Sequence, residues 1–415
     1  MREGIGIADQ RNWRGTIYQL LLGLLLLLLP VQFALGTEIR FAPSDVVLLL
    51  LVLFGGFRIA TSRDDWSAWH LVLLAMFSAS LLTSALRYGS VTRWALINKY
   101  VGLLVLLVLY LVIVQYARTP RAVWRIAQLV VWSVFLQGVF ALPLYFIGLR
   151  YAPLHTYRIQ ALAADPNAYG GLVVLAIALH WATVNTPARL ISRRLAWPVT
   201  LVLVLNLLLC FSRSAWIGFV FVVLSILIFR RRAWPHVAVP FALGVSLVLI
   251  FFRSYFITQI WPLIDRHEQV TARVVIIEDA MTTFVAHPIF GGGLGSYIDT
   301  YGYQIHNTFF WMLAEMGVVG ATVFIIFVGI FALRGYRAYK AADEQYRGLM
   351  AGLLIAHLAM IGLSVGIEAF YQRSWWVVMA LLNASWVLMV KRGAVPVAHD
   401  TAVTAAADGA HAAGE

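Results

Sequence analysis

The feature that most constrains the fold is a series of long apolar runs separated by short polar loops. Runs such as 17–34 and 101–115 approach the roughly 20 residues that a helix needs to cross a bilayer core of about 30 Å. Across the 415 residues, 61% are hydrophobic and only 12% are charged, and a soluble domain has no place for so much apolar surface. The pattern predicts an all-α, polytopic integral membrane protein.

The apolar runs predict about twelve transmembrane helices. They lie at 15–35, 43–60, 66–86, 96–117, 122–148, 167–185, 196–212, 214–229, 235–252, 306–333, 347–366 and 374–390. With the N-terminus in the cytoplasm, every even-numbered loop carries Arg or Lys, as in Arg230, Arg231 and Arg232, which satisfies the positive-inside rule. Both termini are therefore expected in the cytoplasm.

Four regions follow from this topology. Residues 1–252 hold spans 1–9, 253–305 form one large periplasmic segment, 306–390 hold spans 10–12, and 391–415 form an Ala-rich tail expected to be disordered. Arg11 and Arg14 precede the first apolar run, which is either a cleaved signal peptide or, as we favour, a retained span.

Composition narrows the function classes. The net charge of +12 raises the question of nucleic acid, but much of the Lys and Arg lies in short loops, so topology is the simpler cause and no nucleic-acid partner is expected. Cys210 is the only cysteine, which excludes a disulfide within the chain and a cysteine-based metal site.

Several arginines lie in predicted external loops, where the positive-inside rule does not require them: Arg158, Arg213, Arg266 and Arg273. External loops tolerate some arginine, and that reading stays open for each residue. Arg213 is the sharpest case, because its turn, Phe211-Ser212-Arg213-Ser214, is too short to reach far from lipid. A charge held in the apolar region costs roughly 2.5–3.5 kcal/mol and is usually paired or used.

Residues 253–305 contain a predicted helix from 273 to 286, with apolar side chains at Val274, Ile277 and Met281. We expect this helix to lie along the membrane surface and to end at His287-Pro288. The glycine cluster at 291–295 predicts a flexible turn whose backbone N–H groups are free to approach an anion.

The chain has no nucleotide-binding motif and no Asp-x-Asp pair, so neither a metal nor another cofactor is expected. A group-transfer substrate must then carry its own activation. Clustered arginines suit a phosphate or pyrophosphate, which guanidinium groups bind through two oxygens. Tyr297, Tyr301, Tyr303 and Trp311 either stack on sugar rings or belong to an interfacial aromatic belt.

His306 is the candidate general base. It is predicted to begin a helix, whose positive end disfavours the imidazolium form and leaves a neutral ring that accepts a proton. The alternative is a structural histidine that makes hydrogen bonds at a helix start.

The segment His306-Asn307, nine residues and then Gly317-Val318-Val319-Gly320 resembles the signature of bacterial O-antigen ligases. Glycines at i and i+3 also let a neighbouring helix approach closely. Further likeness to the superfamily of ligases, O-antigen polymerases and protein O-oligosaccharyltransferases extends over roughly residues 155–325. It lies in Ala164-Asp165-Pro166-Asn167, Ser212-Arg213-Ser214 with Trp216 and Gly218, Arg273, and Pro288-x-x-Gly-x-Gly.

The resemblance implies a membrane glycosyltransferase that acts at the periplasmic face of the bacterial inner membrane, among membrane lipids. The donor would be undecaprenyl-pyrophosphate-linked O-antigen, and the acceptor a hydroxyl of lipid A-core. By likeness, His306 would activate the acceptor, and Arg213 and Arg273 would hold the pyrophosphate. Arg158, Arg266, Asn307 and Tyr301 are further substrate-binding candidates. Direct attack would invert the anomeric centre without metal or nucleotide.

Three other functions stay open. An O-antigen polymerase uses the same donor lipid, although the spacing from His306 to Gly320 favours the ligase. A protein O-oligosaccharyltransferase is expected to be longer after its last span. A lipid-linked glycan transporter would place ionisable residues through the membrane midplane, whereas here they gather at one face, with Glu315 as the main exception.

Overall fold

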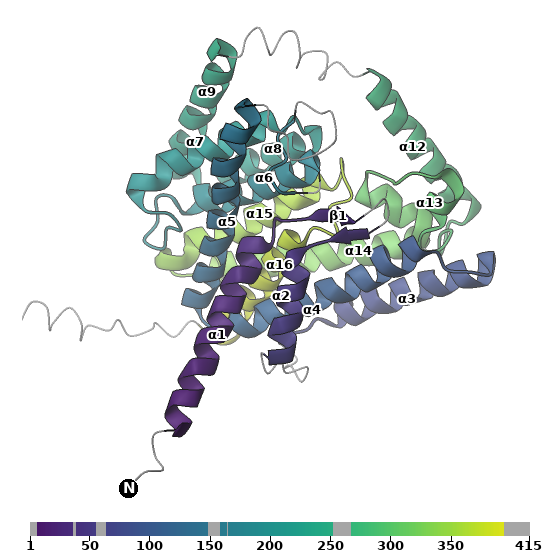
Figure 1. Cartoon of the computed structure of the whole chain (residues 1–415), viewed down its shortest axis with the longest axis horizontal. Coiled ribbons are helices and arrows are strands. Elements are labelled where there is room, and N and C mark those ends of the chain that lie inside the picture. Colours follow the sequence, from purple (N-terminus) through teal and green to yellow (C-terminus); the bar gives the residue numbers. More distant parts are fainter. Residues whose placement is uncertain are drawn as a thin grey trace, which may run out of the picture.

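The computed structural model describes residues 6–35, 39–54, 64–147, 158–163, 165–251 and 267–393. Within these ranges the chain forms a bundle of helices with one short hairpin (Figure 1). The N-terminal half contains α1 Gly6–Leu28, β1 Phe33–Leu35, β2 Ile39–Phe41, α2 Pro43–Phe54, α3 Ala68–Tyr88, η1 Trp94–Val101, α4 Gly102–Tyr116, α5 Pro120–Phe146, α6 Pro166–Thr183 and α7 Arg193–Leu209. The rest contains α8 Arg213–Phe229, η2 Arg231–Ala233, α9 Trp234–Phe251, α12 His267–Ala286, α13 Ser296–Tyr301, α14 Thr308–Ala341, α15 Glu344–Leu363, α16 Arg373–Trp386 and η4 Val387–Lys391.

A helix overlaps each of the twelve predicted spans. In the described part of the chain, six helical segments are long and apolar enough to cross a membrane: 68–88, 94–116, 120–146, 308–341, 344–363 and 373–391. The helical membrane protein that the sequence predicts is therefore confirmed, while the number of twelve spans stays a prediction.

The structure corrects the first predicted span, which was expected to continue to residue 35. Helix α1 ends at Leu28, because Pro30 cannot donate the backbone hydrogen bond that would extend it. The chain then forms β1, which pairs antiparallel with β2 and aligns Phe33 with Phe41. The fold is thus all-α except for this hairpin.

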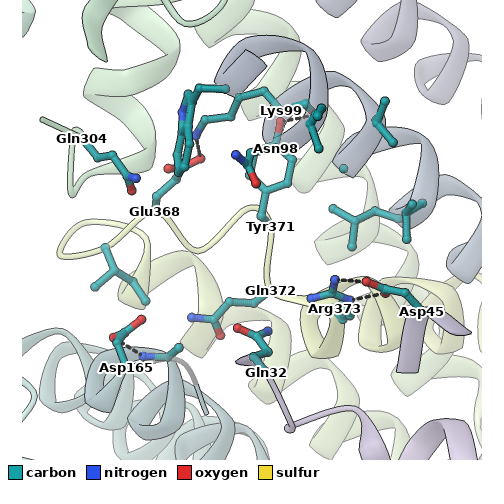
Figure 2. Close-up of a pocket in the computed structure, with 18 of the residues that line it drawn as sticks. Gln32, Asp45, Asn98, Lys99, Asp165, Gln304, Glu368, Tyr371, Gln372 and Arg373 are labelled. Carbon is teal, nitrogen blue, oxygen red and sulfur yellow. Dashed lines mark hydrogen bonds and ion pairs between the residues drawn. The ribbon is translucent and has the colours of Figure 1, made fainter. Parts of the chain in front are cut away.

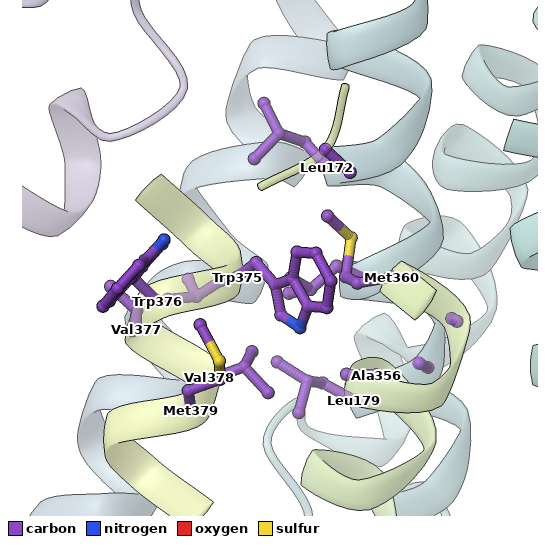
Figure 3. Packing of buried hydrophobic residues seen from close by; sticks show 14 of the residues in the cluster. Leu172, Leu179, Ala356, Met360, Trp375, Trp376, Val377, Val378 and Met379 are labelled. Carbon is purple, nitrogen blue, oxygen red and sulfur yellow. The ribbon is translucent and has the colours of Figure 1, made fainter. Parts of the chain in front are cut away.

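The core is built where α6, α15 and α16 pack together. Figure 3 shows Trp375 of α16 surrounded by apolar side chains of α6 and α15, including Leu179 and Met360. Its indole N–H donates to Nδ1 of His357 at 2.9 Å, so the one polar group of this large side chain is satisfied. Close packing of α15 on α6 depends on small residues, since a Cβ at Gly352 would lie 3.2 Å from the Cβ of Ala182.

Helix α14 is broken at Gly317, where the backbone has φ 65° and ψ −166°. The expectation that the two glycines of the Gly-x-x-Gly motif admit a neighbouring helix needs correction at Gly317. A Cβ there would overlap the backbone of Ile289 and would lie 2.7 Å from the N of Gly291. Glycine is therefore required by the positive φ and by a loop, not a helix, that approaches the break.

The loop 288–295 fills the break in α14 and satisfies the backbone groups that it frees. Gly292 and Gly293 donate to the carbonyls of Ala314 and Glu315 at 2.8 and 3.0 Å. In the other direction, the N–H of Val318 donates to the carbonyl of Pro288 at 2.9 Å. The Pro-x-x-Gly-x-Gly and Gly-x-x-Gly motifs are thus two halves of one structural joint between α12 and α14.

The prediction that this glycine cluster offers free N–H groups to an anion is wrong. Besides the two bonds into the break, Gly291 donates to the carbonyl of His287 at 2.9 Å, and Gly295 donates to Oε2 of Glu315 at 2.9 Å. The same carboxylate oxygen accepts the indole N–H of Trp311 at 2.7 Å. The Glu315 carboxylate therefore stabilises the joint. This structural role explains why an ionisable residue occurs at this position of a predicted membrane span.

The predicted helix in the large external segment is confirmed as α12, which ends at Ala286, two residues before Pro288. Figure 1 shows α12 and α13 with α3 and α14 at one end of the bundle. Whether α12 lies along a membrane surface stays a prediction.

Candidate active site

A cavity of about 400 Å³ opens where five parts of the chain meet (Figure 2). They contribute Gln32 and Asp45, residues within 94–106 and 165–168, Gln304 and His306, and residues within 367–373. Each of these parts contains or adjoins a loop that the predicted topology places on the external side. The structure thus brings residues that are far apart in the sequence together around one cavity. The polar lining residues are Gln32, Asp45, Asn98, Lys99, Asp165, Asn167, Gln304, His306, Glu368, Tyr371, Gln372 and Arg373.

Five helices begin at this cavity. The first turns of α2, η1, α6 and α16 contribute lining residues, and His306 lies just before α14. The start of a helix carries a partial positive charge and unpaired backbone N–H groups. Their convergence favours a transition state that develops negative charge.

His306 lines the cavity and is exposed, between the buried residues Ile305 and Asn307. The prediction that His306 begins the helix is wrong by two residues, because α14 starts at Thr308 and Asn307 is its N-cap. The asparagine is a better cap, since its side-chain oxygen accepts the N–H groups of Phe309 and Phe310 at 2.9 and 3.1 Å. His306 still lies close to the positive end of α14.

Asn307 and Thr308 also fix the loop between α15 and α16. Asn307 Nδ2 donates to the carbonyl of Val365 at 2.7 Å, and Thr308 Oγ1 donates to the carbonyl of Ile367 at 3.1 Å. The N–H of Ala369 donates back to Thr308 Oγ1 at 3.0 Å. Asn307 is not among the described residues that line the cavity, and the amide oxygen and nitrogen both bond to the backbone.

The α15–α16 loop carries Glu368, whose carboxylate forms an ion pair with Lys99 of η1. The Lys99 side chain is almost fully buried, and its ammonium lies 4.2 Å from the ring centre of Trp311 and 5.0 Å from that of Tyr371. The hydroxyl of Tyr371 donates to the carbonyl of Lys99 at 2.8 Å. A buried ammonium needs such partners, and together they fix one wall of the cavity.

A second ion pair lies at the edge of the cavity, at the start of α16. Arg373 donates from Nε to Oδ1 of Asp45 at 2.8 Å and from Nη2 to Oδ2 at 2.6 Å. Two parallel bonds of this kind fix both side chains. The pair joins α2 to α16 across the edge of the cavity, as Figure 2 shows.

Arg158 lies behind the wall at the start of α6. Its Nη2 donates to Oδ1 of Asn167 at 2.7 Å, and its Nε donates to the carbonyl of Cys210 at 2.8 Å. Asp165 caps α6 by accepting the N–H groups of Asn167 and Ala168. The Asp165-Pro166-Asn167 motif therefore builds a capped helix start, and Arg158 anchors it to the end of α7.

The structure places Arg213 and Arg273 within electrostatic reach of each other. Burial lowers the pKa of Arg273, and the nearby Arg213 lowers it further. Arg213 begins α8, and its neighbour Ser214 packs so closely on the α15–α16 loop that a Cβ at Gly366 would overlap it. Arg213 thus begins α8 beside the loop that Asn307 holds, although neither Arg213 nor Arg273 is among the described residues that line the cavity.

Tyr301 lies in a tyrosine cluster on α13 rather than in the cavity wall. Its ring centre is 4.8 Å from that of Tyr297 and 6.1 Å from that of Tyr303. Tyr303 donates a hydrogen bond to Asp279 of α12. The cluster joins α13 to α12. Arg266 lies outside the described residues, so its predicted role is neither supported nor contradicted.

Sequence reasoning did not select Glu368, Gln372, Arg373 or Asp45 as site residues. Glu368, Gln372 and Arg373 lie in the short external loop before the last predicted span, and Arg373 is the last residue of that loop. A run of polar residues in a loop of a very apolar chain is the signal that could have identified them.

Two comparisons with known proteins bear on the function. The family model described as O-antigen ligase matches residues 198–325. This range contains Arg213, Arg273, His306 and the joint at Gly317. Among curated proteins, no relative matches the chain. Residues 198–325 are thus similar to the O-antigen ligase family, and the apolar helices support a multi-pass membrane protein.

Proposed function

We propose that this chain, whose residues 198–325 match the family model described as O-antigen ligase, is an O-antigen ligase of the bacterial inner membrane. It would transfer O-antigen polysaccharide from undecaprenyl pyrophosphate to a hydroxyl of lipid A-core at the periplasmic face, with no cofactor. The observation that carries the proposal is the exposed His306 in a cavity at which five helices begin. That arrangement puts a proton acceptor next to a region that favours negative charge.

The positions of the charged side chains suggest that the pyrophosphate and the sugars of the substrate bind in two different regions. Arg213 and Arg273 are near each other, and two guanidinium groups suit the two phosphates of a pyrophosphate. Both cations that line the cavity, Lys99 and Arg373, are paired with carboxylates. The pyrophosphate therefore fits the arginine pair, and the sugars fit the cavity.

The reaction is a single displacement. The acceptor hydroxyl gives its proton to a ring nitrogen of His306 while its oxygen bonds to the anomeric carbon of the donor sugar. The bond between that carbon and the phosphate oxygen breaks, and its electron pair leaves with undecaprenyl pyrophosphate. Attack from the side opposite the leaving group inverts the anomeric centre. The charge that grows on the departing phosphate is stabilised by Arg213 and Arg273.

A polymerase is the nearest alternative, because it would use the same base and donor with a second lipid-linked glycan as acceptor. The test is transfer by the purified full chain in lipid nanodiscs, with the glycan-bearing lipid and without nucleotide or added metal. We expect glycan to move to lipid A-core and not to a second glycan-bearing lipid. Transfer only to the second glycan would assign a polymerase. No transfer to either acceptor would overturn the proposal.

A further inference from the structure

One buried side chain in the cavity has a hydrogen-bonding atom without a partner. Gln372, the N-cap residue of α16, is 9% exposed, and its Oε1 accepts no hydrogen bond from the described part of the chain. Figure 2 shows the side chain extending from the start of α16 toward the side of the cavity where Gln32 and Asp165 lie. A buried oxygen of this kind is rare unless something binds to it.

The fold keeps space for this amide. A Cβ at Gly171 of α6 would lie 3.0 Å from Gln372 Oε1 and 2.7 Å from Cδ2 of Leu363. Gly171 therefore lets the amide stay beside α6 at the edge of the cavity. The Gln372 side chain makes no capping bond to α16, so the helix start does not account for its position.

The chemistry of Oε1 determines which kind of group can bind to it. An amide oxygen only accepts, so it needs an O–H or N–H donor, and a phosphate oxygen that also accepts would be repelled. The wall holds four more amides, Gln32, Asn98, Asn167 and Gln304, of which Asn167 already accepts a hydrogen bond from Arg158 through its Oδ1. Trp94 and Tyr371 add ring faces. Alternating donors and acceptors with aromatic faces match the hydroxyls and the apolar faces of a sugar ring.

We infer that the cavity side formed by Gln372 and Gln32 is a subsite for an uncharged glycosyl residue, with Gln372 Oε1 accepting one of its hydroxyl or acetamido hydrogens. This inference rests on the proposed glycosyl transfer. A negatively charged sugar is disfavoured, because Lys99 and Arg373 are already paired with Glu368 and Asp45 and the Asp165 carboxylate also lines the cavity. The glycosyl residue is either the first sugar of the donor or the terminal sugar of the acceptor.

Direct binding tests this inference without relying on turnover. The purified full chain in nanodiscs is titrated with undecaprenyl pyrophosphate, with its O-antigen-bearing form and with lipid A-core, for wild type and Gln372→Met. We expect the variant to bind one of the two sugar-bearing ligands about tenfold more weakly, the effect of one lost hydrogen bond. The affected ligand tells which sugar occupies the subsite. Affinity for sugar-free undecaprenyl pyrophosphate should change less than about twofold.

Two further variants test whether the side-chain oxygen of Gln372 itself binds the sugar. Gln372→Glu keeps an acceptor oxygen at the same reach, so it should bind the affected ligand more tightly than Gln372→Met. Gln128→Met is the matched control, because Gln128 bonds to the carbonyl of Leu190 and is not among the described cavity residues. It should leave all three affinities unchanged.

Unchanged affinity for both sugar-bearing ligands in Gln372→Met would overturn the inference, as would equal weakening for the sugar-free lipid. Loss of folding in Gln372→Met would also overturn it, because the amide would then serve the fold. A wild-type protein that binds sugars as expected but transfers none would overturn only the proposed function.

Discussion

Asn307 donates from Nδ2 to the carbonyl of Val365 at 2.7 Å, and this bond ties the start of α14 to the α15–α16 loop. The other end of the same amide caps α14. One side chain thus fixes His306, which precedes it, relative to Glu368 and Gln372 on the loop. The alignment of the candidate base with the cavity wall depends on this residue.

The two bonding functions of Asn307 can be separated. Asn307→Asp keeps the oxygen that caps α14 but replaces the donor to Val365 with a second acceptor. We expect Asn307→Asp to lose most of its transfer rate, with a smaller loss of melting temperature than in Asn307→Ala. The alanine variant loses the cap as well, at about 0.5–2 kcal/mol. Equal transfer rates in wild type and Asn307→Asp would show that the tie to Val365 does not position the base.

The joint at Gly317 gives a stability prediction with a control in the same helix. Gly317→Ala must place a Cβ against the backbone of Ile289 at φ 65°, and we expect it to lose more than about 2 kcal/mol of unfolding free energy. A Cβ at Gly329 meets nothing within 4 Å. Gly329→Ala should be neutral or stabilise by up to about 1 kcal/mol. Thermal unfolding in one detergent compares them, and similar melting temperatures would contradict the role of the joint.

Much of the fold and part of the site follow from local sequence patterns. Apolar runs predict the helices, since burial in lipid depends on composition over about 20 residues. The motif around His306 predicts a helix start two residues before the observed one at Thr308, and the structure brings Arg213 near Arg273. The helices depend on residues that are neighbours in the sequence, and the loop assignment depends on which side of the membrane each loop is predicted to lie.

The remaining features depend on contacts between distant residues. Lys99 and Glu368 are 269 positions apart, and no local pattern pairs them. Gly317 has the i, i+3 spacing of a helix interface, so its positive φ is not visible until the loop 288–295 is placed against it. The same contact uses the loop's N–H groups, which explains why the predicted anion site does not exist.

Arg213 offers a test of ligand binding against topology. Arg213→Lys keeps the positive charge but loses the planar group that binds two phosphate oxygens. We expect kcat/KM for the donor lipid to fall by at least about tenfold, with an unchanged melting temperature. Arg193→Lys is the matched control, because Arg193 is an exposed first residue of α7. Wild-type transfer by Arg213→Lys would mean that Arg213 serves only as a topological charge.

His306 provides the most direct test of the mechanism. Because its side chain is exposed in the cavity while Asn307 and Thr308 hold the local backbone, His306→Ala should fold normally. Loss of a general base should lower the chemical step by roughly 10²–10⁴-fold. Donor affinity should survive, since the proposed pyrophosphate ligands Arg213 and Arg273 are intact. The experiment measures donor affinity, melting temperature and transfer rate on one purified variant, with His287→Ala as the control outside the described cavity lining. Normal transfer would remove His306 from the mechanism. Joint loss of folding, binding and transfer would instead identify a structural histidine, because a base is needed only while the acceptor hydroxyl loses its proton.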